Sequence, residues 1–120
     1  MSKKAIHWSG VFPAVSTQFR SDYSLDLDAT HAVMKNLVKD GVSGLVVCGS
    51  VGENTSLSTD EKLQIIEVAK DAAGGKIPVI AGVAEFTTAF AQKMAKEAER
   101  VGVDGIMAVS YTHLTLPTKL

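Results

Sequence analysis

One short loop, residues 49–54, holds the residues best suited to chemistry. Its sequence is G-S-V-G-E-N. The two glycines let the backbone approach a ligand closely, exposed N–H groups are expected, and Ser50 adds a hydroxyl. Such a loop can hold a carboxylate or a phosphate, although it lacks the lysine of a P-loop and does not match the G-x-G-x-x-G dinucleotide pattern. The alternative is a simple tight turn between a strand and a helix, which the pattern alone slightly favours.

Covalent chemistry also needs a nucleophile, and the sequence places none beside this loop. Lys76 precedes a predicted strand, at the face opposite the loop. The single cysteine, Cys48, is expected to be a small core residue, because no histidine is placed to activate it. Six more lysines fall within predicted helices, where solvated surface positions are expected: Lys35, Lys39, Lys62, Lys70, Lys93 and Lys96. No candidate nucleophile remains.

The loop must be positioned by secondary structure, and short apolar runs alternate with helical patterns along the chain. The apolar runs predict strands over residues 11–15, 45–48, 78–81 and 106–109. They start about 30 residues apart, the size of one strand–helix–strand unit. This alternation indicates a parallel sheet with helices outside it. Two architectures remain open at this point: an open doubly wound sheet, or the opening half of a (β/α)8 barrel, which needs about 250 residues.

Three helices are predicted between the strands, with signals at both ends of each. The candidate N-terminal caps are Asp26 or Asp28, Ser58 with Glu61, and Thr87 or Thr88. Each helix is followed by a glycine suited to a left-handed conformation: Gly41, Gly74 and Gly102. On the third helix, four residues are expected to face inward: Phe90, Met94, Ala98 and Val101. The 49–54 loop then follows a strand at its carboxyl end, where parallel α/β proteins carry their chemistry.

Composition and charge exclude several kinds of partner. The 120 residues carry a net charge of −1, so there is no electrostatic case for nucleic acid or an anionic membrane. We find no secretory signal and no run of about 18 apolar residues, and a single cysteine is typical of a reducing cytoplasm. The histidines match no metal-ligand spacing: His7, His31 and His113. We therefore expect a soluble, cytoplasmic protein without a metal or cofactor.

The loop and its surroundings resemble one known family. G-S-V-G-E at 49–53, followed by S-L-S at 56–58, resembles the G-T/S-T-G-E…L-T/S signature of the dihydrodipicolinate synthase/N-acetylneuraminate lyase family. The stretches 10–17, 77–83 and 102–105 agree with that family as well, in order and without large gaps. The resemblance implies an α/β fold that is the N-terminal half of a (β/α)8 TIM barrel, rather than an open sheet.

The resemblance also implies a class I aldolase or lyase mechanism. A lysine of this family forms a Schiff base with pyruvate or another 2-oxo acid, and the iminium serves as the electron sink, so no metal is required. Ser50 stands where the family places a hydroxyl of the proton relay, and Ser50 and the backbone N–H of Val51 are expected to bind the substrate carboxylate. The family usually has threonine at position 51. Valine lacks that hydroxyl and a hydrogen bond of about 1.5–3 kcal/mol, which implies a different substrate or a weaker affinity.

Two other positions depart from the family pattern. Phe86 and Phe90 stand where lysine-inhibited synthases have an asparagine and a glutamate, so feedback by lysine is not expected. A catabolic aldolase or dehydratase is then as consistent with the sequence as the biosynthetic synthase. The family's Schiff-base lysine and relay tyrosine belong to later strands, beyond Leu120.

We therefore predict that residues 1–110 are three strand–helix units and a fourth strand of a partial barrel. Residues 111–120 do not continue the family pattern, and we interpret them as a non-native tail that resembles translated adaptor sequence. The parent is predicted to be a homo-oligomeric, cytoplasmic lyase with a small 2-oxo acid substrate, and this chain alone is predicted to be inactive. The alternative is a non-enzymatic half-barrel or a carboxylate-binding module, completed by a partner chain.

Overall fold

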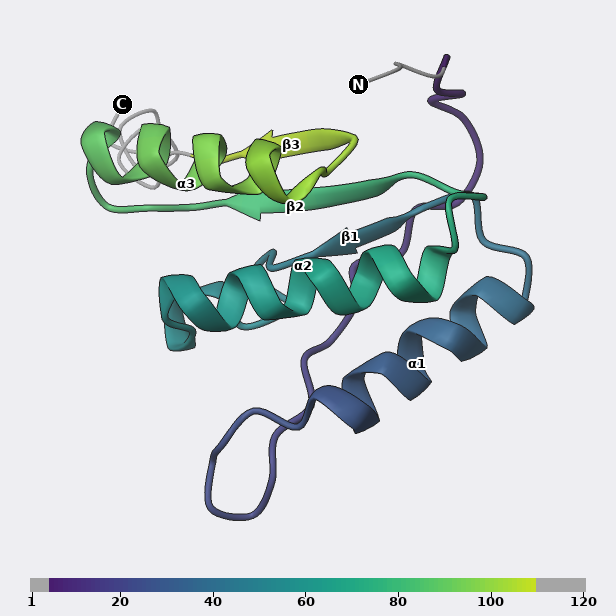
Figure 1. The fold of residues 1–120 in the computed structure, drawn as a ribbon, viewed down its shortest axis with the longest axis horizontal. Coiled ribbons are helices and arrows are strands. Elements are labelled where there is room, and N and C mark those ends of the chain that lie inside the picture. The colour runs from purple at the N-terminus through teal and green to yellow at the C-terminus, as the bar shows by residue number, and fades with distance from the viewer. Residues whose placement is uncertain (1–4, 110–120) are drawn as a thin grey trace, which may run out of the picture.

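The computed structural model describes residues 5–109. Helices and strands alternate within this range, as the sequence pattern predicts, and Figure 1 shows them in order along the chain. The elements are α1 (Leu27–Lys39), β1 (Leu45–Val47), the short 3-10 helix η1 (Asn54–Ser56), α2 (Thr59–Ala73), β2 (Val79–Val83), α3 (Thr88–Val101) and β3 (Gly105–Ala108). No helix in this part of the chain has the length and apolar character needed to cross a membrane.

The strands form a parallel sheet in the order β1-β2-β3. Val46 of β1 is in register with Ile80 of β2, and Ala81 of β2 with Ile106 of β3. Helix α2 packs on β1 and β2 and contacts both α1 and α3, so it lies between the other two helices (Figure 1). A parallel sheet whose crossover helices contact one another in sequence order is the arrangement of a partial barrel.

The predicted first strand, residues 11–15, is wrong as a regular strand. The segment runs parallel to β1 but makes only one bridge, between Ala14 and Val46. The Val15 N–H donates to the Val46 carbonyl at 2.8 Å, and the Val46 N–H donates to the Pro13 carbonyl at 3.0 Å. Because Pro13 has no N–H to donate, the regular ladder is interrupted there, although the Ser43 N–H still donates to the Val11 carbonyl at 2.8 Å. The segment therefore lies where a first strand is expected but is held by few bonds.

The helix ends follow the sequence signals. Asp26 accepts from the Ala29 N–H at the start of α1, and Thr87 accepts from the Phe90 N–H at the start of α3. Ser58 and Glu61 exchange hydrogen bonds in a capping box that opens α2. Each bond satisfies a backbone donor that the first helical turn leaves unpaired. These local polar contacts fix where each helix begins relative to the preceding loop.

The core lies between α2 and the sheet. Ile65 and Ile66 of α2 are almost fully buried, together with Met34 of α1. On α3, Met94 and Ala98 are buried as predicted, but Phe90 is 62% exposed, so its predicted inward position is wrong. Phe90 shares the stripe of Met94 and Ala98 but lies in the first helical turn, where Ala91 rather than Phe90 packs against the core.

Candidate functional site

The loop between β1 and α2 lies at the carboxyl end of the sheet. Cys48 follows the last residue of β1 and is buried, whereas Ser50 and Val51 are exposed, Val51 to 58%. The loop then turns through η1 and ends at Ser58, the cap of α2. Ser50 and Val51, the substrate-binding residues predicted from the sequence, therefore occupy the rim of the sheet. Their roles in binding and proton relay stay predictions.

Three adjacent backbone donors of this loop have no acceptor among the described residues, and two of the three residues, Ser50 and Val51, are exposed whereas Gly52 is buried. The Glu53 N–H donates to the Ser50 carbonyl at 3.0 Å, and the Asn54 N–H donates to the Gly49 carbonyl at 3.1 Å. By contrast, the N–H groups of Ser50, Val51 and Gly52 find no acceptor within residues 5–109. Consecutive unpaired N–H groups form a concave site that attracts an anion. The loop is thus more than a tight turn: it offers donors for a carboxylate or phosphate.

The loop holds a strained conformation. Cys48 and Glu53 both have a φ of 59°, a left-handed value that costs a residue with a side chain roughly 1–2 kcal/mol. The turn lies against β2, where a Cβ on Gly82 would come within 2.5 Å of the Cys48 carbonyl oxygen. Only glycine allows the two backbones to approach this closely. Packing around the loop must therefore offset its strain.

Two buried side chains that sequence reasoning missed hold the loop. The Thr17 hydroxyl donates to the Gly52 carbonyl at 2.6 Å, and the Asn54 side-chain amide donates to the Cys48 carbonyl at 2.7 Å. Both residues are buried, at 6% and 1% exposure. The available signal for Asn54 was an asparagine in a glycine-containing turn, where its side chain often bonds nearby backbone. No local signal marked Thr17.

Lys62 corrects one expectation. The sequence predicts a solvated surface lysine, but Lys62 is 4% exposed and its Nζ donates to Glu85 Oε1 at 2.8 Å. Lys62 belongs to the start of α2 and Glu85 follows β2, so the ion pair joins two segments at the carboxyl end of the sheet. A buried ammonium needs such a partner, and a partner on another element leaves no helical periodicity. With its ammonium paired to a carboxylate, Lys62 is not a ready nucleophile.

Cys48 is the small core residue that the sequence predicts. It is fully buried, and its Sγ lies 3.8 Å from the Lys62 carbonyl oxygen. Burial raises the pKa of the Cys48 thiol to about 12, although the nearby Lys62 charge opposes the shift. The thiolate is the reactive form of cysteine. At neutral pH this thiol is therefore protonated and unreactive.

Comparison with known proteins decides the family. The model of the dihydrodipicolinate synthetase family matches residues 7–115. The chain belongs to this family. The 4-hydroxy-tetrahydrodipicolinate synthase of Methanospirillum hungatei JF-1 is 43% identical over 105 residues, which are 86% of this chain and 36% of that synthase. The chain spans about a third of the length of the curated relatives that it matches.

Solved structures of the dihydrodipicolinate synthetase family share the fold. The dihydrodipicolinate synthase from Aquifex aeolicus gives a TM-score of 0.79 at 32% identity, over 84% of this chain and 34% of that one. YagE, a prophage protein of the family from E. coli K12 in complex with pyruvate, gives 0.78 at 34% identity, over 84% and 34% of the two chains. The prediction of an α/β fold that is the N-terminal half of a TIM barrel is confirmed.

The barrel fold also indicates which end of the sheet is expected to carry the active site. TIM-barrel enzymes of all kinds carry their active sites at the carboxyl ends of the strands. A hollow of about 270 Å³ lies at that end, beside the loop, and is lined by Phe19, Tyr23, Glu53 and Ser56. The Ser50 loop and the Lys62–Glu85 pair share this end, so the candidate site of this family member lies here.

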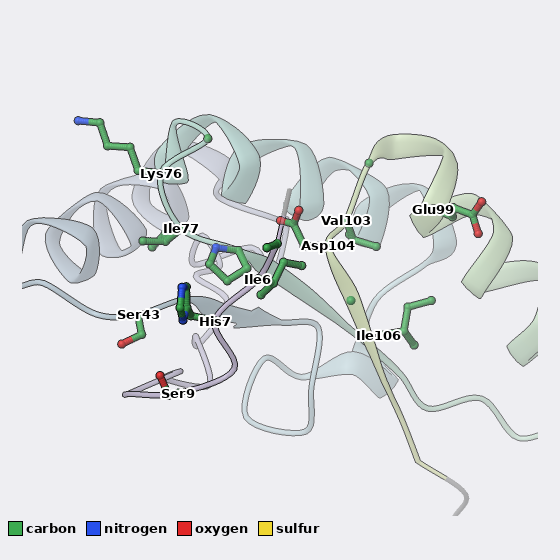
Figure 2. Close-up of a pocket in the computed structure, with 15 residues that line it drawn as sticks. Ile6, His7, Ser9, Ser43, Lys76, Ile77, Glu99, Val103, Asp104 and Ile106 are labelled. Atoms are coloured by element: carbon green, nitrogen blue, oxygen red, sulfur yellow. The ribbon is translucent and has the colours of Figure 1, made fainter. Parts of the chain in front are cut away.

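A larger hollow of about 890 Å³ lies at the opposite end, where strands β2 and β3 begin. Figure 2 shows Lys76 and Glu99 at opposite sides of it, with side chains that point away from each other, while His7 and Asp104 lie between them. Its charged groups do not converge on one point. Within the described residues, no group of three or more His, Cys, Asp or Glu is placed to hold a metal ion.

Proposed function

We propose that this chain is part of an enzyme that forms a Schiff base between a lysine and pyruvate or another 2-oxo acid, and then makes or breaks a carbon–carbon or carbon–oxygen bond. Membership in the dihydrodipicolinate synthetase family supports the reaction class. A family member at 34% identity solved in complex with pyruvate supports the substrate class. The single observation that carries the proposal is the set of unpaired N–H groups at Ser50, Val51 and Gly52.

Each residue of the loop has a part in this proposal. The N–H groups of Val51 and Gly52 donate to the substrate carboxylate, which anchors the 2-oxo acid at the carboxyl end of the sheet. The hydroxyl of Ser50 both accepts and donates hydrogen bonds, as a proton relay requires. The reacting carbonyl then lies farther into the barrel, where a lysine of the whole enzyme forms the iminium that accepts electrons.

We propose that the 120-residue chain supplies this carboxylate site but does not turn over substrate. Within residues 5–109, the one buried lysine, Lys62, is paired with Glu85. A Schiff-base lysine must have its amine free to attack a carbonyl, whereas the Lys62 Nζ is engaged by Glu85 Oε1 at 2.8 Å. We further propose that the whole enzyme is a homo-oligomer of the reducing cytoplasm. Light scattering on the full-length family protein tests the assembly, and a monomer would contradict it.

Borohydride trapping tests the function. The chain is incubated with pyruvate and sodium borohydride, which reduces any iminium to a stable amine, and its intact mass is measured. The expected result is an unchanged mass, together with pyruvate-dependent NMR shifts at Ser50, Val51 and Gly52. A covalent adduct on one lysine would contradict the proposed inactivity. The absence of any shift at these three amides would contradict the carboxylate site.

A second candidate is a carboxylate-binding module without covalent chemistry, completed by a partner chain. The pairing of Lys62 with Glu85 favours it, because the carboxyl end of the sheet then offers donors but no free amine among residues 5–109. The same trapping experiment, repeated on the full-length family protein, separates the two. A trapped adduct there supports the enzyme, and binding without an adduct supports the module.

A further inference from the structure

The N–H groups that would bind a carboxylate lie in a loop whose backbone conformation is unfavourable without supporting contacts. Cys48 and Glu53, which flank them, both adopt a left-handed conformation with a φ of 59°. Residues with a Cβ avoid this region unless surrounding contacts impose it. The carboxylate site therefore needs residues outside the donor triplet that hold the loop in place.

Thr17 provides the first contact, from a different part of the sheet. It follows the 11–15 segment, and its hydroxyl donates to the Gly52 carbonyl at 2.6 Å over a separation of 35 positions. Gly52 itself is packed so closely that a Cβ there would lie 3.0 Å from the Val15 carbonyl oxygen. The hydrogen bond thus fixes the peptide that follows the donor triplet and ties it to the neighbouring segment.

Asn54 provides the second contact, from inside the loop. Its side-chain amide donates to the Cys48 carbonyl at 2.7 Å, and its backbone N–H donates to the Gly49 carbonyl at 3.1 Å. One residue thereby engages both carbonyls that precede Ser50. The carboxamide oxygen of Asn54 is buried and has no donor within residues 5–109. A buried amide oxygen without a donor lowers stability, so the position of Asn54 calls for an explanation.

We propose that Thr17 and Asn54 are positioning residues for the carboxylate-binding N–H groups of Ser50, Val51 and Gly52. Their hydrogen bonds hold the carbonyls of Gly52 and Cys48 and so fix the conformation of the loop that carries the three donors. The inference rests on the proposed function, because it assigns a purpose to donors that the proposed function gives to a 2-oxo acid. Neither residue touches the substrate.

The test uses the ¹⁵N-labelled 120-residue chain and four single variants. Thr17→Val removes the hydroxyl at constant shape, and Thr17→Ser restores it. Asn54→Ala removes the amide, and Thr55→Ala is a matched control, because Thr55 is exposed in the same loop. Two quantities are measured: amide hydrogen exchange at Glu53 and Asn54, and the shifts of the triplet amides during titration with sodium pyruvate against sodium chloride.

Thr17→Val and Asn54→Ala should raise exchange at Glu53 and Asn54 about tenfold, while exchange of the Ile66 amide in α2 changes less than about twofold. The pyruvate concentration for half-maximal shift should rise about fivefold in both variants, the size of one lost hydrogen bond. Thr17→Ser and Thr55→Ala should behave as the unsubstituted chain. If Thr17→Val does not fold, Asn54→Ala decides alone.

The outcomes separate this inference from the proposed function. Unchanged exchange at Glu53 and Asn54 in both variants would overturn the positioning role. An unchanged pyruvate response in a chain whose loop has loosened would also overturn it, and would leave the carboxylate site standing. A third outcome is faster exchange in the variants together with no pyruvate response in the unsubstituted chain. This outcome would overturn the proposed function, although Thr17 and Asn54 would still be shown to stabilise the loop.

Discussion

Two polar regions lie side by side at the carboxyl end of the sheet, and they differ in what is left unpaired. The Lys62–Glu85 pair carries full charges, but each charge is matched at 2.8 Å and Lys62 is 4% exposed. The Ser50 loop carries no charge on its donor triplet, yet three N–H groups are unpaired within residues 5–109. A region that satisfies itself stabilises the fold, whereas a region with donors to spare can bind. Unpaired hydrogen-bond donors, rather than charged side chains, therefore distinguish the candidate site.

Removal of the Lys62 ammonium should have the largest effect on stability, because it unpairs the region whose charges are matched. Lys62→Met leaves the Glu85 carboxylate, which is 20% exposed, without its partner. Loss of one member of a buried ion pair should lower the free energy of unfolding by about 3 kcal/mol, as measured by urea denaturation. The double variant Lys62→Met/Glu85→Gln should recover part of this loss, because it removes the unmatched charge as well. Equal stability of Lys62→Met and the unsubstituted chain would show that the pair contributes nothing.

Cys48 contacts both regions, and the burial of its thiol should make the stability of the chain depend on pH. Its thiol has a pKa raised from 9.0 to about 12, so the folded chain keeps a proton that the unfolded chain releases. The stability that this proton contributes is complete below pH 9 and is lost as pH rises toward 12. At pH 10 the loss should be about 1 kcal/mol. The stability of Cys48→Ala should fall less between pH 8 and pH 10, and parallel slopes for both chains would contradict this prediction.

Ser50→Ala should have the smallest effect on stability, which would distinguish the Ser50 loop from the Lys62–Glu85 pair. The side chain is exposed, and within residues 5–109 its hydroxyl makes no hydrogen bond. The free energy of unfolding should change by less than about 0.5 kcal/mol, measured as for Lys62→Met. A loss of more than about 1 kcal/mol would mean that Ser50 supports the loop itself.

The sequence predicts those features that depend on neighbours in the chain. The capping box of Ser58 and Glu61 spans three positions, so its residue types indicate it directly. The buried runs of β1 and β2 carry the apolar pattern of strands covered on both faces. Predictions failed where a residue's environment depends on a distant element. Lys62 has its partner 23 positions away, so helical periodicity alone placed it on the surface.

The site, like the fold, could be predicted only where its features depend on residues close together in the chain. Ser50 and Val51 could be proposed because the motif places them after a strand, where the barrel fold carries its active site. Thr17 could not, because its bond to Gly52 joins positions that only the parallel sheet brings together. The conformation of Cys48 was also invisible, since nothing in its residue type indicates a left-handed φ.

The single bridge between Ala14 and Val46 has a consequence for the stability of the site. Val15 of the 11–15 segment packs in the core with Ile66, but the segment makes one bridge and three backbone hydrogen bonds to residues 43–46, so its detachment should require less energy than the unfolding of the core. Thr17 follows this segment and moves with it. Detachment should release Gly52 from Thr17, and the loop that carries the carboxylate donors should then lose its shape while α2 and the sheet remain folded. We therefore expect the site to open before the core unfolds, so that conditions mild enough to leave the core intact abolish binding.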